Sequence, residues 1–130
     1  MSTKHLAHIL IALVCTMSTI AQASEDRFIC RARAFFGKTP CGKEKYAVPD
    51  KGVLRVKLDR VEHNFCIKVD AIDVATNKNV ASGILVCRGS DTIVWPNHTG
   101  TTFNLKLAIH AADLDQSLGG DGLTGAVVIE

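Results

Sequence analysis

Four cysteines between residues 30 and 87 place the strongest constraint on how this chain of 130 residues can fold. They are Cys30, Cys41, Cys66 and Cys87, and a fifth, Cys15, lies in an apolar N-terminal segment. Zinc sites usually show CxxC or HxxxH spacing, and the sequence contains neither. Without Cys15 the number of cysteines is four, and an even number in a small domain is typical of disulfide cross-links when that domain is exported. We therefore expect two disulfides and no bound metal.

The N-terminal segment has the pattern of an export signal. Lys4 precedes an apolar run from Leu6 to Val14, and Ala21-Gln22-Ala23 forms a small-x-small cleavage motif. A membrane span needs about 20 apolar residues, and this run is shorter and is followed by polar residues. We predict that residues 1–23 are a cleavable signal peptide. Residues 24–130 then form one secreted or periplasmic domain with no membrane span.

Apolar and polar residues alternate in short segments, the pattern of β-strands that bury one face. Leu54, Val56 and Leu58 are separated by charged residues, for example, and polar turns such as Pro49–Gly52 and Thr76–Asn79 punctuate the chain. The sequence predicts an all-β domain, a small disulfide-stabilised β-sandwich or barrel of about seven short strands.

Residues 103–114 fit two patterns. Phe103, Leu105, Leu107, Ile109 and Ala111 alternate with other residues, as a strand requires, but Leu107, Ala108, Ala111, Ala112 and Leu114 could form a helical stripe. We favour the strand because the alternation extends over five positions.

The two later cysteines predict the register of one hairpin. If the polar turn is centred between Thr76 and Asn77, Cys66 lies opposite Cys87, with Ile67 opposite Val86 and Val69 opposite Ile84. Cβ atoms of directly opposed residues lie close enough for a disulfide. Among the three possible connectivities we expect Cys66–Cys87, which leaves Cys30–Cys41.

Catalytic motifs are absent. The sequence contains no nucleophile elbow, HExxH segment or phosphate-binding loop, and we expect no cofactor. A small secreted hydrolase could still use His63 beside Glu62, with an arginine such as Arg60. In an extended segment, however, adjacent residues point to opposite faces. An enzyme is therefore the third hypothesis.

A binding surface is predicted at Trp95, Asn97, His98 and Thr99. Tryptophan is frequent at binding hot spots, and the following polar loop offers hydrogen bonds. Asn97-His98-Thr99 is also an N-glycosylation sequon. A core tryptophan at a strand end is the alternative interpretation.

Charge is distributed unevenly, with a basic excess over residues 24–68 and an acidic excess over residues 69–130. This asymmetry could give a basic face for an acidic partner, or it could average out where strands interleave. Nucleic-acid binding is not expected, because basic residues are too few and aromatic residues are scarce.

One segment resembles a known family. Phe65-Cys66-Ile67-Lys68, Cys87 and Ile93-Val94-Trp95-Pro96 are similar to the central hairpin of sugar-binding B subunits in subtilase-type and typhoid-type toxins. The similarity covers about a quarter of the chain. The aromatic-rich helix and the later cysteine pair of that family have no counterpart here. The resemblance implies a glycan-binding toxin or adhesin subunit as an alternative function.

The hypothesis we favour is an exported, non-enzymatic binding protein, such as an inhibitor, an immunity-type factor or a host-directed secreted factor. Its partner would be a protein or a glycan outside the cytoplasm.

Overall fold

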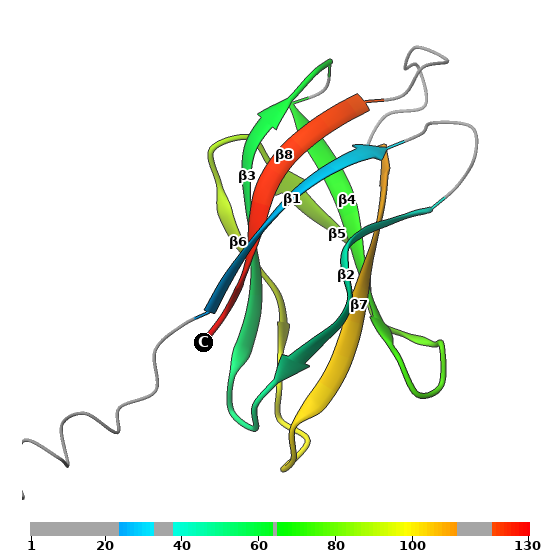
Figure 1. Cartoon of the computed structure of the whole chain (residues 1–130), viewed down its shortest axis with the longest axis vertical. Coiled ribbons are helices and arrows are strands. Elements are labelled where there is room, and N and C mark those ends of the chain that lie inside the picture. The colour runs from blue at the N-terminus through cyan, green and yellow to red at the C-terminus, as the bar shows by residue number, and fades with distance from the viewer. Residues whose placement is uncertain (1–23, 33–37, 64, 112–120) are drawn as a thin grey trace, which may run out of the picture.

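A computed structural model of the chain describes residues 24–32, 38–63, 65–111 and 121–130 as an all-β domain (Figure 1). Within these residues there is no helix, and so none long and apolar enough to cross a membrane. The predicted signal peptide, residues 1–23, lies outside the described part. The strands are β1 (Ser24–Ala32), β2 (Thr39–Val48), β3 (Val53–Val61), β4 (Cys66–Asp73), β5 (Asn79–Cys87), β6 (Asp91–Pro96), β7 (Phe103–Ala111) and β8 (Asp121–Ile129).

The strands form two antiparallel sheets of four, in the orders β1-β8-β3-β6 and β2-β7-β4-β5 (Figure 1). β4 pairs with β5, β3 with β6, β2 with β7 and β1 with β8. The eight strands therefore form one long hairpin whose innermost pair is β4–β5, wound so that successive strand pairs alternate between the two sheets. This strand order is that of a jelly roll. The predicted all-β fold is confirmed, as a sandwich with eight strands.

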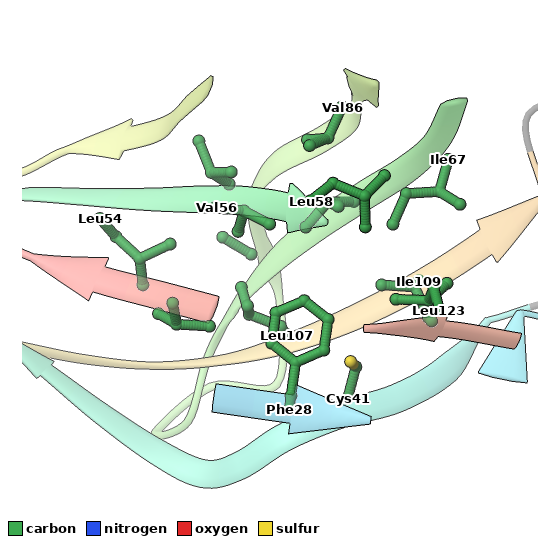
Figure 2. Packing of buried hydrophobic residues seen from close by; sticks show 14 of the residues in the cluster. Phe28, Cys41, Leu54, Val56, Leu58, Ile67, Val86, Leu107, Ile109 and Leu123 are labelled. Carbon is green, nitrogen blue, oxygen red and sulfur yellow. The ribbon is translucent and has the colours of Figure 1, made fainter. Parts of the chain in front are cut away.

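The core lies between the sheets, and side chains from both point into it (Figure 2). The predicted alternation on β3 is confirmed, since Leu54, Val56 and Leu58 are each at most 1% exposed. Ile67 on β4 and Ile109 on β7 meet them from the other sheet. Burying a side chain of this size contributes about 1.5–3 kcal/mol, so the facing rows supply the main driving force for folding.

A disulfide and a buried tyrosine join the edges of the two sheets at β1 and β2. Cys30 is bonded to Cys41. The Tyr46 hydroxyl donates to Asp26 Oδ2 at 2.7 Å and accepts from the backbone N–H of Lys43 at 2.8 Å. Burial and the Asp26 hydrogen bond raise the pKa of Tyr46 to about 12. The hydrogen bond from Lys43 to this tyrosine lies within the irregular stretch of β2 between Cys41 and Tyr46, where the pairing register shifts.

The predicted register of the central hairpin is confirmed. Cys66 pairs with Cys87, Ile67 with Val86 and Val69 with Ile84, and the first pair forms a disulfide. Nearer the tip the register shifts twice and the last pair is Ile72–Asn79. The turn is therefore centred one residue earlier than predicted, because β5 contains extra residues that no partner on β4 opposes.

The bounds of β2 and β7 follow from the sequence to different degrees. β2 begins at Thr39, although Pro40 and Gly42 interrupt any strand pattern in the first half of this segment. Residues Phe103–Ala111 are a strand, as favoured, and residues 112–114 lie outside the described part.

The Cys66–Cys87 disulfide, at the end of the β4–β5 hairpin away from its turn, should matter for stability. In a variant with Cys66→Ser and Cys87→Ser, the unfolded chain gains the freedom of a loop with a sequence separation of 21. In the chain-entropy model this lowers the free energy of unfolding by about 3 kcal/mol. Urea denaturation measures the change, and non-reducing peptide mapping of the native protein should recover the Cys66–Cys87 link. Free thiols at both positions would contradict the assignment.

Candidate functional site

The loop predicted as a binding surface joins β6 to β7 at the end of the sandwich where β8 finishes. Trp95 is half-buried, and its ring packs against Phe103 with centroids 5.1 Å apart. His98 and Thr99 are exposed. The aromatic face of Trp95 thus has a partner within the domain, which agrees with the alternative interpretation of this residue.

Asn97 is fully buried, with no exposed surface. Its side-chain amide donates to the carbonyl groups of Val48 and Thr101 at 2.9 and 2.8 Å, and to that of Pro49 at 3.1 Å. Its Oδ1 accepts from the backbone and hydroxyl of Thr99. Asn97 therefore ties the β2–β3 turn to the β6–β7 loop, and a folded domain offers no access for a glycan at this sequon. The loop as a partner-binding surface stays a prediction, carried by its exposed residues.

Replacing Asn97 should destabilise the domain. In Asn97→Ala, buried carbonyl groups lose their donor, which costs about 1–3 kcal/mol. The neighbouring change His98→Ala removes an exposed side chain and should alter stability by no more than about 0.5 kcal/mol. Thermal unfolding of the two variants measures the difference. Equal melting temperatures would show that Asn97 does not hold the two loops together.

A basic cleft lies at the opposite end of the β1-β8-β3-β6 sheet. It encloses about 730 Å³ and is lined by Ile29, Cys30, Arg31, Arg60, Val61, Glu62, Arg88, Gly122, Leu123 and Thr124. We call it the arginine cleft. Its three arginines come from β1, β3 and the turn after β5, so segments far apart in the sequence build it.

A β-bulge brings Arg60 to the surface. On β3, Leu58 pairs with Gly125 of β8, whereas Arg60 pairs with the next residue back, Thr124. Asp59 is therefore the extra residue, and it and Arg60 are both exposed between the buried Leu58 and Val61. Bulges commonly re-aim a side chain in this way.

The same bulge receives the turn that carries Arg88. The N–H of Gly89 donates to the Leu58 carbonyl at 2.7 Å, and the Leu58 N–H donates to Ser90 at 3.2 Å. The backbone N–H of Arg88 donates to Phe65 at 2.8 Å, next to the Cys66–Cys87 bond, and its guanidinium lies 5.3 Å from the Phe65 ring centroid. These contacts hold Arg88 beside β3, although β5 belongs to the other sheet.

The arginines in and beside this sheet differ in whether they form an ion pair with a carboxylate. Arg27 is paired with Asp59 at 2.7 Å, and Arg55 with Asp91 and Glu130 at 2.7 and 3.1 Å. Arg31 lies 3.3 Å from Glu62. Arg60 and Arg88 form no ion pair with any carboxylate in the described ranges. The cleft therefore presents two uncompensated guanidinium groups, which can bind carboxylate or phosphate oxygens.

Glu62 and His63 also belong to this end of the sandwich. Their side chains are in contact, with Nε2 and Oε1 3.1 Å apart, because the segment is not extended there and the expectation for an extended segment does not apply. The strand ends at Val61, and the chain bends there. The other Glu62 oxygen accepts from the Gly122 N–H at 3.1 Å. A Cβ atom on residue 122 would lie only 2.7 Å from that oxygen, so glycine suits this position. Glu62 is thus engaged in holding β3, β8 and Arg31 together.

No protein-family model, curated protein or solved structure matches this chain. The toxin-subunit resemblance therefore gains no support from them and stays a hypothesis. No group of three or more histidine, cysteine or acidic side chains in the described ranges could hold a metal ion.

A buried aspartate stands on the outer face of the other sheet. Asp70 of β4 is 1% exposed, accepts from the Gly83 N–H at 2.6 Å and lies 2.5 Å from Lys38 Nζ. His110 Nε2 is 3.9 Å away. Gly83 has a φ of 62°, a conformation that glycine adopts without strain. Asp70 therefore anchors the irregular part of β5, a structural role that periodicity alone did not reveal.

The charge of Asp70 should make stability depend on acid pH. Burial raises the pKa of Asp70, but the Lys38 and Gly83 hydrogen bonds and the nearby cations outweigh it and hold the pKa below 3.8. Because the folded pKa is the lower one, the stabilisation is complete above pH 4 and is lost as pH falls through the folded value. Near neutral pH, Asp70→Asn should cost about 2 kcal/mol.

Urea titrations from pH 7 to about pH 2 test this, with the difference between Asp70→Asn and the native protein shrinking below pH 4. Asp59→Asn serves as control, since Asp59 forms an exposed ion pair worth at most about 1 kcal/mol. A difference for Asp70→Asn that does not change with pH would show that its charge is not the stabilising feature.

Proposed function

We propose that this chain is a non-enzymatic binding protein that works outside the cytoplasm and recognises an anionic partner through the arginine cleft. The observation that carries the proposal is that Arg60 and Arg88 lack a carboxylate partner among the described residues, whereas Arg27 and Arg55 have one. Two disulfides support an oxidising compartment.

The structure of the cleft supports the proposal, because the backbone at Arg60 and at Arg88 is held in place before a partner arrives. The bulge at Asp59 directs Arg60 outward, and three backbone hydrogen bonds fix the turn of Arg88. A prearranged site loses less conformational freedom on binding than a mobile one. By contrast, Asn97 and Thr99 in the β6–β7 loop form hydrogen bonds with each other and with the backbone, which leaves them fewer groups for a partner.

The proposal is tested with a fluorescein-labelled oligoglutamate as the probe, followed by fluorescence anisotropy at low salt. Arg60→Ala with Arg88→Ala should weaken binding about tenfold or more, because close charge pairs supply this affinity. The control variant, Lys78→Ala with Lys106→Ala, removes the same charge from positions outside the cleft and should change binding about twofold at most.

Two outcomes would contradict the proposal. Equal losses in the arginine and lysine variants would mean that the probe senses only net charge. Cleavage of the probe by the native protein, abolished in His63→Ala, would favour the hydrolase built on Glu62 and His63 instead.

A further inference from the structure

One exposed apolar side chain, Ile29, lines the arginine cleft, and a second, Phe65, lies beside the cleft against the Arg88 guanidinium. Ile29 of β1 is 87% exposed and Phe65, under the Arg88 guanidinium, is 58% exposed. Ile29 on β1 and Arg60 on β3 both pair with Thr124 of β8, so they lie on either side of β8 in one row across the sheet, about 10 Å apart at two strand spacings. The row thus runs from Ile29 through Arg60 and Arg88 to Phe65.

This composition is that of a protein-binding surface. Single exposed apolar residues are common, but arginine and large apolar groups together are enriched where proteins bind proteins. An apolar side chain buried at such a contact contributes affinity that charge alone does not, because water is released from both surfaces. An occupant that uses the whole row needs both an anionic group and an apolar one.

Other anionic occupants fit the row less well. A free phosphate would use backbone N–H groups, and the Gly122 N–H is already donated to Glu62. A flat anionic membrane would meet the Glu62 carboxylate, which lies in the lining of a concave site.

We propose that the occupant is an acidic segment of a partner protein in which a carboxylate side chain lies beside a large apolar one. The carboxylate contacts Arg60 and Arg88, and the apolar side chain packs on Ile29 or Phe65. This inference rests on the proposed function and adds the chemistry of the partner.

Two labelled peptides of equal length and charge test the inference, one alternating glutamate with leucine and the other glutamate with serine. The native protein should bind the leucine peptide about tenfold more tightly, since partial burial of apolar side chains contributes on this scale. Ile29→Ser with Phe65→Ser should reduce that ratio to near one while binding of the serine peptide persists.

Leu85→Ser with Ile93→Ser is the matched control. Leu85 and Ile93 are 53% and 56% exposed, lie outside the cleft lining, and pair with Lys68 and Arg55 rather than with a residue of the row. The preference for the leucine peptide should therefore remain. Melting temperatures of both double variants confirm that each remains folded.

The outcomes separate the two proposals. If both peptides bind equally but Arg60→Ala with Arg88→Ala still weakens them, the inference fails and the proposed function stands. If binding of neither peptide depends on those arginines, the proposed function fails. If the native protein instead sediments with phosphatidylglycerol vesicles and binds neither peptide, the occupant is a lipid surface and the inference is overturned.

Discussion

The fold depends on the pairing of β4 with β5, because this hairpin is the tip about which the rest of the chain winds. Each successive strand pair is more distant in sequence, from β3–β6 to β1–β8. Closing such pairs costs more chain entropy as the intervening segment grows, so a defined inner pair makes the outer ones less costly. Cys66 and Cys87 hold that inner pair in one register, and through the backbone contact of Arg88 with Phe65 the same end of the hairpin shapes the cleft.

β-Bulges in β3 and β5 determine which groups reach the surface at those positions. In β3 the extra residue at Asp59 places Arg60 outside and docks the Arg88 turn on Leu58. In β5 extra residues near Gly83 bring its N–H to Asp70. An inserted residue in a strand disturbs the ladder locally and changes which side chains face outward, while the core rows on either side keep their alternation.

Polar side chains in the domain fall into two groups: those that have hydrogen-bond or ion-pair partners within the protein, and those that do not. Asn97 and Asp70 are buried, and each is surrounded by hydrogen-bond partners, as burial of a polar group requires. Arg27 and Arg55 have carboxylate partners. Arg60 and Arg88 are the exceptions among the described arginines, and their exposure means that water solvates them until a partner replaces it. A site of this kind costs little stability and is available for binding.

The all-β class, the alternation on β3 and the Cys66–Cys87 pairing followed from the sequence by itself, because each depends on a local period of two or on a short turn between adjacent strands. The length of β2, the tip of the hairpin and the burial of Asn97 did not, because they depend on bulges and on carbonyl groups about 50 residues away. The arginine cleft belongs to this second group. Residues 29, 60 and 88 are unremarkable in sequence, and only the pairing of β1 and β3 with β8, together with the docked turn, brings their side chains to one place.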